Sequence, residues 1–505
     1  MRFAPTAQGR WQQLDGTRRG FISRCEVYAG YTLPKICLPD NFNQNSTQMS
    51  HDFQAVGAQA VNHLSNKMML SLFAPSSTFF RLDASATAQE VFAELNMSAE
   101  EITPLLAKTE RDAIALLDRL ALRPKLYEAV KHLIITGNVL LCLEDDGGAR
   151  VIGLKRYAVR RSMSGRVIEL MIVDKVLMDE LEDRVKSYVE QETGYPEDRS
   201  VTLYRWVRWQ EGEYRMTQWV DGVALPEEFN GKWSDKEMPY RVLTWDLADG
   251  EDYGTGLVED YAADFSGLSA LSKSQVQGAI LASEFRWLVN PAGQTRVEDF
   301  ADTPNGGAMP GTEGDIVIIE SGKSKDLSVT MNMSQEYVNR IGRGFLLGSL
   351  LVRQAERVTA EEIRMTANEL ETALGGGYSR LAVDFQGPMA RWLLEQLKVN
   401  ISDKFEVTVI TGLDALSRTS DLDDAKLWLQ DMGLANSLPE QMQMRIKWDE
   451  LGALFAVPRR VDISRIWKSD EEMAAAMQAE QERQGQMVAA QAGADIAVNS
   501  AKDKG

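Results

Sequence analysis

The chain has 505 residues, too many for a single hydrophobic core, and its length predicts three or four domains. Hydrophobic residues make up 44% and charged residues 26%, which is typical of a soluble globular protein. The net charge of −19 argues against a protein whose main surface grips nucleic acid. No apolar run is long enough to cross a bilayer and the N-terminus lacks the apolar core of a signal peptide, so we expect a cytosol-like compartment.

Residues 1–136 are predicted to be mainly helical. Residues 1–50 start with an amphipathic stretch and become loop-like around two prolines, so we expect an outer arm. Apolar residues at helical spacing predict a helix over residues 53–73. Two further helices are expected at residues 99–120 and 124–136.

The pattern changes to a period of two from Asn138 onward. The segment N-V-L-L-C-L-E predicts a strand, and D-G-G after it predicts a turn. Alternation in V-T-L-Y-R-W-V-R-W and in Y-R-M-T-Q-W-V predicts further strands. We therefore expect an N-terminal region over residues 1–256 whose first part, 1–136, is helical and whose second part, 137–256, is β-rich.

Two helices around a small β module are predicted next. The helices are expected at residues 257–288 and 334–351. Between them, residues 289–333 are rich in glycine and proline and contain the strand D-I-V-I-I-E. This arrangement predicts a stalk that carries a foot.

A long helix with a well-defined start is predicted after a short polar connection at residues 352–358. Thr359 and Glu362 have the spacing of a capping box. Each glycine inside a helix costs about 1 kcal/mol relative to alanine. We therefore expect the helix to bend or break at Gly375, Gly376 and Gly377. A strand near residue 410 is expected to return to the β layer, which completes a segment over residues 359–412, and residues 413–505 are predicted to be helical.

Several separate segments resemble, in the same order, the portal proteins that form the head-to-tail connectors of short-tailed phages. They are A-E-R-V-T-A-E-E-I-R with E-L-E-T-A-L-G-G-G-Y-S (355–379), the helix at 53–73, L-I-I-T-G-N-V-L-L (133–141), L-V-N-P-A-G (288–293) and V-T-V-I-T-G-L-D-A-L (407–416). The resemblance implies an α+β portal fold with a β-containing wing, a two-helix stem, a small α/β clip, a long kinked helix and a helical crown. It further implies that twelve such subunits assemble as a ring.

The resemblance also implies a function and a set of partners. The ring would sit at one vertex of the capsid in the virion, after assembly in the host cytoplasm, and genomic duplex DNA would pass through it during packaging and ejection. The implied partners are the large subunit of the terminase, the major capsid and scaffolding proteins, the tail adaptor and internal core proteins. An acidic wall would let duplex DNA slide, although ordinary solubility explains the net charge equally well.

The connection at residues 352–358 corresponds to the tunnel loop of that family, which faces the DNA. The resemblance places Arg357 there first, with Arg353, Gln354 and Glu356 behind it. The alternative is that the two arginines only pair with Glu356 or Glu361, and this alternative stays open.

No catalytic chemistry is predicted. The segment around Gly322, Lys323 and Ser324 lacks the earlier glycine of a phosphate-binding loop. The histidines His51, His63 and His132 lack metal-ligand spacing, and Cys25, Cys37 and Cys142 lack C-x-x-C spacing and are expected to be unreactive thiols. We expect no cofactor, no metal and no enzyme activity. The two rivals are an enzyme, such as a nuclease or the packaging motor, and a capsid or scaffold protein that forms no channel.

Overall fold

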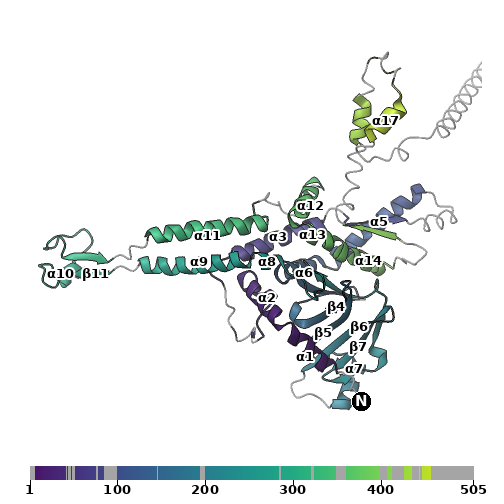
Figure 1. Ribbon diagram of the computed structural model, residues 1–505, viewed down its shortest axis with the longest axis horizontal. Helices are drawn as coiled ribbons and strands as arrows, with labels where there is room; N and C mark the ends of the chain where they lie inside the picture. The colour runs from purple at the N-terminus through teal and green to yellow at the C-terminus, as the bar shows by residue number, and fades with distance from the viewer. Residues whose placement is uncertain are drawn as a thin grey trace, which may run out of the picture. The chain divides into compact units, whose positions relative to one another are not determined.

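The structure is a computed structural model that describes most of the chain. The described residues are 6–40, 42–43, 47, 52–75, 78–84, 99–144, 146–193, 200–283, 286–319, 324–348, 360–398, 407–411, 426–434, 439, 443 and 446–456. The chain divides into two units, Met1–Ala415 and Leu416–Gly505. Figure 1 shows their elements. Within these ranges, no helix combines the length and the apolar character that a bilayer span requires.

Two helices form the centre of the core of the first unit. Helix α3 (Val56–Leu72) packs against helix α6 (Arg123–Thr136), as the apolar spacing of both segments predicts. Helix α3 is buried on most of its surface, because apolar residues occur around nearly its whole circumference. Helix α5 (Ala99–Arg119) matches the helix expected after residue 99.

The N-terminal segment is not the outer arm that we expected. Helix α2 (Arg19–Tyr31) contacts α6 and buries Cys25, Tyr28 and Ala29 in the main core. The spacing of these residues brings them to one face of a helix, and this face supplies the apolar surface that binds the segment to the core. Helix α1 (Ala7–Thr17) packs on a sheet instead.

Residues 137–256 contain two antiparallel sheets, where the alternating pattern predicts strands. The smaller sheet has the order β10-β2-β3 and the larger has the order β4-β5-β6-β7-β8, with β9 paired to β7. The strands are β2 (Asn138–Leu143), β3 (Ala149–Ile152), β4 (Tyr157–Arg161), β5 (Val167–Leu177), β6 (Ser200–Gln210), β7 (Glu213–Val220), β8 (Val223–Ala224), β9 (Gly231–Trp233) and β10 (Tyr240–Thr244).

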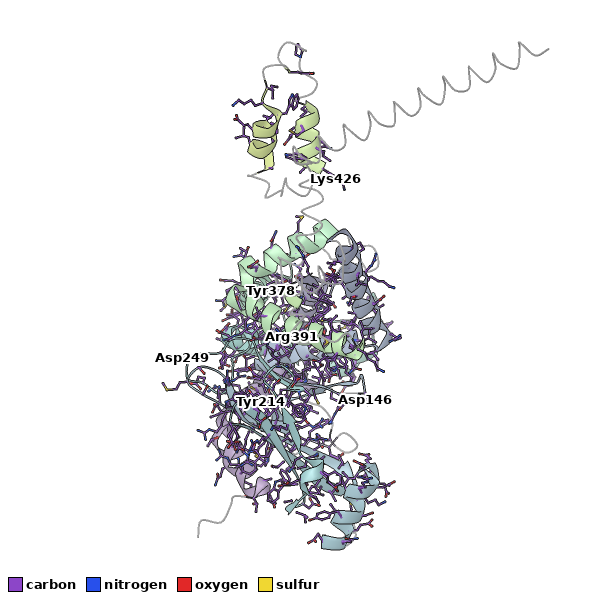
Figure 2. All side chains as sticks on the ribbon, turned by 90° about the vertical axis from the view of Figure 1, so that its right-hand side faces the viewer. Asp146, Tyr214, Asp249, Tyr378, Arg391 and Lys426 are labelled. Atoms are coloured by element: carbon purple, nitrogen blue, oxygen red, sulfur yellow. The ribbon has the colours of Figure 1, made fainter. Side chains whose placement is uncertain are left out.

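The two faces of the larger sheet have different surroundings. One face, which includes Leu170, Val207 and Tyr214, belongs to the main core. This core also includes Tyr378 of the helical layer, and Figure 2 shows both tyrosines. The opposite face packs against α1 through a separate cluster that includes Met171 and Trp206. The sheet therefore presents one core face and one partly covered face.

The strand expected near residue 410 forms, but it does not join the β layer. Strand β13 (Val407–Thr411) pairs with β1 (Phe80–Ala84) in a separate two-stranded sheet. The alternation of V-T-V-I-T indicates a strand, but alternation carries no information on which distant strand supplies the hydrogen bonds.

The second unit is helical in its described residues. Residues 426–434 form a helix, and α17 spans Trp448–Ala456. Trp428 is buried, and its indole Nε1 donates a hydrogen bond of 2.9 Å to the carbonyl of Gly452. The further helices expected after residue 460 lie outside the described residues.

The three cysteines are free and buried, which agrees with the expectation of unreactive thiols. Burial raises the pKa of Cys37 to about 11 and that of Cys142 to about 12, and it raises the pKa of Cys25 further. Because the thiolate is the reactive form, these thiols react slowly at neutral pH.

His132 on α6 is buried against Gly153, and its Nδ1 atom has no hydrogen-bond partner among the described residues. Burial lowers the pKa of His132 to about 4. The folded protein therefore disfavours the charged imidazole, whereas the unfolded chain protonates it near pH 6.5. The stability that the neutral form provides is complete above about pH 7 and is lost as the pH falls toward 4.

We predict that the free energy of unfolding falls by about 2 kcal/mol between pH 7.5 and pH 5 because of His132. His132→Leu should remove this part of the pH dependence, as measured by urea unfolding at both pH values. His63→Gln is the matched control, because His63 is only partly buried. An unchanged slope in His132→Leu would contradict the assignment.

Candidate functional site

Two long antiparallel helices project from the core and carry a small module at their far end (Figure 1). They are α9 (Ala262–Ser283) and α11 (Ser324–Gly344), which contact each other along their length. The module consists of β11 (Arg286–Val289), α10 (Val297–Asp302) and β12 (Ile316–Ile319). Below, "stem pair" means α9 with α11, and "end module" means residues 286–319.

The boundaries differ from those predicted. The helix expected at 257–288 is divided into α8 (Leu257–Asp260) and α9, and its last residues form β11. Arg286–Val289 is a strand because it pairs with Ile316–Ile319, and this partner cannot be recognised from helical periodicity.

The second helix of the stem pair starts at Ser324 rather than at residue 334, so it includes residues that we had assigned to the module at 289–333. It also ends before residue 351, because the following turn contains Leu346 with a φ of 57°. The amide of Leu347 there donates to the carbonyl of Gly342 at 2.7 Å, which closes the helix end.

The base of the stem pair is fixed in the main core by aromatic residues. Phe265 and Phe345 are fully buried, and their ring centroids lie 5.8 Å apart. Tyr261 contacts the same Phe345 ring at 5.6 Å. Leu268, close in sequence to Phe265, and Ile341, close in sequence to Phe345, are also buried. The two helices therefore contribute their core ends to one cluster.

The two helices are also joined above this cluster. Asp264 and Arg340 form an ion pair of 3.0 Å, and Gln275 Nε2 donates to Ser334 Oγ at 2.7 Å. Gly267 permits the close approach, because a Cβ atom at this position would lie 2.9 Å from the Tyr337 ring. These contacts make the stem pair one rod-like element.

The outer part of the stem pair exposes many apolar side chains. The exposed fractions are 48% for Val276, 56% for Ile280, 58% for Val329, 63% for Met331 and 47% for Met333. Helix α9 carries only two charged residues, Asp264 and Lys273. A protruding element with little charge and much exposed apolar surface indicates an interface.

The end module is held together by Asp315. Its Oδ2 atom accepts hydrogen bonds from the amides of Gln294 and Thr295 at 2.9 and 3.1 Å and from Thr295 Oγ1 at 3.0 Å. These bonds from Thr295 and its neighbours lower the pKa of Asp315. Trp287 and Phe300 pack edge to face at 4.8 Å, so strand and helix of the module share a small apolar contact.

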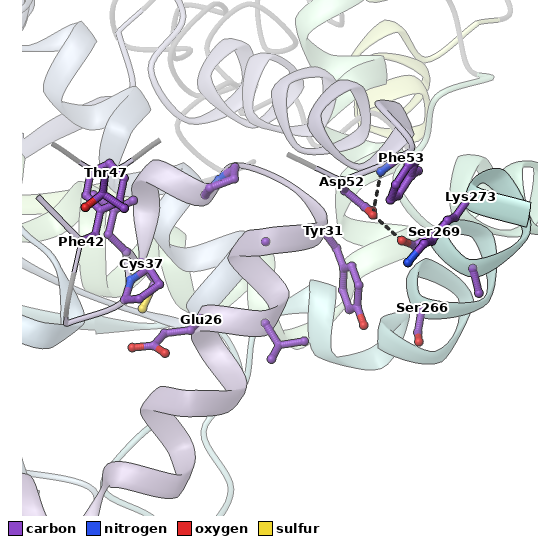
Figure 3. A pocket seen from close by; sticks show the side chains of 16 residues that line it. Glu26, Tyr31, Cys37, Phe42, Thr47, Asp52, Phe53, Ser266, Ser269 and Lys273 are labelled. Atoms are coloured by element: carbon purple, nitrogen blue, oxygen red, sulfur yellow. Dashed lines mark hydrogen bonds between the residues drawn. The ribbon is translucent and has the colours of Figure 1, made fainter. Parts of the chain in front are cut away.

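A pocket of about 630 Å³ lies beside the base of α9 (Figure 3). It is lined by residues of α2, the segment that follows α2, and α9. Asp52 Oδ1 accepts hydrogen bonds from the amide of Phe53 and from Ser269 Oγ. The Lys273 ammonium lies 5.6 Å from the centroid of the Phe53 ring. These contacts attach the segment before α3 to the stem pair.

The predicted loop residues Arg353, Gln354, Glu356 and Arg357 lie outside the described residues, as does Thr359. The long helix is described from Ala360 as α12 (Ala360–Leu374), and Glu362 lies in it, but its side chain is not described. The capping box and the orientation of the loop side chains therefore stay predictions.

The described elements on either side of that loop contact the same helix, α3. His63 Nε2 donates a hydrogen bond of 3.0 Å to the carbonyl of Leu346, just after α11. Lys67 Nζ forms an ion pair of 3.0 Å with Glu369 of α12. Burial, together with the charge of Lys67, lowers the pKa of His63, so its ring is neutral at pH 7.

The sequence analysis did not assign roles to His63, Lys67 or Asp315. A signal was present for Lys67, because it is a single cation within the apolar segment of α3 and therefore needs a buried partner. The roles of His63 and Asp315 depend on backbone groups that folding brings close, and periodicity does not reveal them.

The glycine triplet breaks the long helix at one residue only. Gly375 has a φ of 53°, which ends α12, while Gly376 and Gly377 are helical residues at the start of α13 (Gly376–Leu381). A five-residue π-helical segment, Ala382–Gln386, then leads into α14 (Gly387–Gln396). Helix α12 therefore ends at Gly375, within the triplet where a break was predicted, and a wider turn follows it.

The described residues show no grouping of three or more histidine, cysteine, aspartate or glutamate side chains that could hold a metal ion. The features that remain are the protruding stem pair, its end module and the loop attached to α3. They define a protein that presents interaction surfaces.

Comparison with known proteins identifies the family. A family model described as bacteriophage head to tail connecting protein matches residues 4–457. The portal protein of Enterobacteria phage SP6 is 31% identical over 445 residues, which cover 87% of this chain and 85% of the SP6 protein. The portal protein of Pseudomonas phage phiKMV is 32% identical and covers 99% of this chain and 98% of its own length. The chain belongs to the bacteriophage head-to-tail connecting protein family, as the resemblance predicted.

Among solved structures, a chain from the neck of an empty GTA particle is 14% identical to this chain. The TM-score is 0.38, and the match covers 81% of this chain and 90% of that chain.

We predict that Gly375→Ala destabilises the protein by about 1 kcal/mol, because a side chain strains a backbone with φ of 53°. An added Cβ atom meets nothing within 4 Å, so the cost is purely conformational. Gly387→Ala is the control, since Gly387 has a helical φ of −58° and equally open surroundings. Urea unfolding should show no loss for Gly387→Ala, and equal losses in both variants would contradict the prediction.

Proposed function

We propose that this chain is the subunit of a phage portal, a ring at one capsid vertex through which genomic duplex DNA is packaged and ejected. The observation that carries the proposal is the apolar surface of the stem pair. Five apolar side chains there are at least 47% exposed in the single chain. Identical subunits that meet through two different faces close into a ring when their rotation closes, and this surface is then covered.

The finer assignments follow from the family. We propose a ring of twelve subunits. The stem, which the sequence predicted at residues 257–288 and 334–351, is assigned to α9 and α11, and the clip is assigned to the end module. Residues 1–256 and 359–412 are assigned to the wing and long helix, and residues 413–505 to the crown. The proposed partners are the large terminase subunit and tail adaptor at the clip, the major capsid and scaffolding proteins, and internal core proteins.

The proposed role is structural and not enzymatic. Curated relatives of this chain are portal proteins. We assign the energy for DNA translocation to a separate ATPase, because the sequence lacks a phosphate-binding loop. A capsid or scaffold protein that forms no channel is the less favoured alternative, because a family model for connectors matches most of the chain.

We predict that Met331→Glu reduces ring assembly at least tenfold, measured as the protein concentration at which half of the subunits are in rings. Met331 is 63% exposed on the stem pair, and a carboxylate placed in a dry interface loses its hydration. Negative-stain images and mass photometry give the fraction of rings.

Met163→Glu is the matched control for this experiment. Met163 is 91% exposed, but it lies in the turn between β4 and β5, away from the stem pair. Its variant should assemble like the wild type. Normal rings in Met331→Glu would show that this surface is not the subunit interface.

The loop at residues 352–358 is proposed as the tunnel loop that faces the DNA. Its attachment supports this, because α3 holds the residues on both sides through His63 and Lys67. A short polar segment between two elements that contact the same helix suits a constriction.

Arg357→Ala should leave rings intact while lowering the fraction of DNA-filled particles several-fold. The reason is that a cation in the constriction contacts phosphates of the DNA. Arg19→Ala on α2, an exposed arginine elsewhere, is the control. Full DNA retention in Arg357→Ala particles would refute the role of this residue.

A further inference from the structure

A row of charged residues crosses the larger sheet in one register. The pairs Arg160–Glu169, Glu169–Arg208, Arg208–Arg215 and Arg215–Lys232 are directly opposite residues on neighbouring strands. Directly paired residues point to the same face. With strands about 4.8 Å apart, the row extends roughly 19 Å across β4, β5, β6, β7 and β9.

This face is the one that α1 covers in part. The cluster under α1 contains Met171 and Trp206, and Trp206 is two residues from Arg208 on the same side of β6. The row therefore lies at the margin of the covered area. Arg160 is exposed, Arg208 and Arg215 are half-buried, and Lys232 is exposed.

The one acid in the row does not neutralise its neighbours. Glu169 accepts hydrogen bonds from Arg10 at 2.9 and 2.6 Å and from Trp206 Nε1 at 2.9 Å. Its charge is thus matched by Arg10 of α1. Among the described residues, Arg160 and Arg208 have no ion pair, although both flank Glu169.

The other half of the row is compensated by two acids. Glu213 forms ion pairs of 2.9 Å with both Arg215 and Lys232, and Glu211 contacts Arg215 at 2.5 Å. Like charges directly opposite on neighbouring strands destabilise a sheet. Glu213 bridges the like-charged pair Arg215–Lys232, but within the described residues no acid bridges the pair Arg208–Arg215.

Arg208 is also held in place. Its guanidinium carbon lies 4.4 Å from the centroid of the Trp206 ring, and its Nε atom is buried without a hydrogen-bond partner among the described residues. A planar guanidinium fixed by an aromatic ring loses little entropy when it binds an anion. This geometry supplies a preorganised donor whose opposite acid, Glu169, is already bound by Arg10.

We propose that the row of Arg160, Arg208, Arg215 and Lys232 binds the phosphate backbone of duplex DNA at a site separate from the stem pair. A row of cations about 19 Å long spans several phosphates of a duplex, and nucleic-acid interfaces are polar and positively charged. Protein interfaces have an apolar centre instead, and many of the exposed apolar side chains of this chain lie on the stem pair and end module. The identification of this DNA as the genome that passes through the ring rests on the proposed function.

The test measures binding of the purified full-length chain to a labelled duplex of about thirty base pairs, between about 50 and 200 mM salt. The double variant R160Q/R208Q should lose at least tenfold in affinity. The slope of log affinity against log salt should fall by about 2, since each neutralised phosphate contributes about 0.9. The control is R19Q/R184Q, which removes two exposed arginines from α2 and α7 (Asp183–Thr193).

Each outcome decides the proposal. Equal losses of DNA affinity in R160Q/R208Q and R19Q/R184Q would show that removing any two positive charges has this effect, and this would overturn the proposal. So would tight binding of polyglutamate that R160Q/R208Q abolishes, because the row would then fit an acidic protein surface. If R160Q/R208Q does not fold, R160E alone, at an exposed position, must show the loss.

Mass photometry on the same samples separates this proposal from the proposed function. A chain that never forms rings would remove the portal assignment. Selective loss of DNA binding in R160Q/R208Q would still support the row as a DNA site.

Discussion

The buried ion pair between Lys67 of α3 and Glu369 of α12 sets a constraint on which the arrangement of the first unit depends. The Lys67 side chain is 2% exposed, and its Nζ atom lies 3.0 Å from the carboxylate. The Glu369 side chain is 34% exposed, so the deeply buried member of the pair is the Lys67 ammonium, whose charge requires the carboxylate beside it. The same helix holds the carbonyl of Leu346 through His63. Helix α3 therefore contacts both the end of the stem pair and the long helix and holds them in place relative to each other.

Charge is distributed unevenly over a chain whose net charge is −19. Helix α9 has one acid and one base, and α11 has three bases and two acids, so the stem pair carries a net charge of only +1. One face of the larger sheet carries a row of cations, in which Arg160 and Arg208 stand beside a glutamate that Arg10 already neutralises. A protein can thus repel DNA on average and still bind it at one place, because phosphate contacts are screened beyond about 10 Å.

Much of the architecture could be predicted from local patterns, because helical and alternating periodicities are local. Helices α3, α5 and α6 and the β-rich part follow the patterns closely. The pairing of strands that lie far apart in the sequence could not be predicted. Strand β13 pairs with β1, and Arg286–Val289 leaves a helical pattern to pair with β12. Of the site, a break within the glycine triplet was predictable because glycine is unfavourable in a helix interior, whereas the role of His63 requires knowing where Leu346 folds.

The attachment of the stem pair gives it a mechanical property. Both helices end in the cluster of Phe265 and Phe345, and Leu346 directly follows that cluster. A push along the stem pair is not absorbed at its base, because the aromatic rings there are fully packed. It is transmitted to the turn at Leu346, which His63 ties to α3. The stem pair therefore acts as a rigid strut between its outer end and the core.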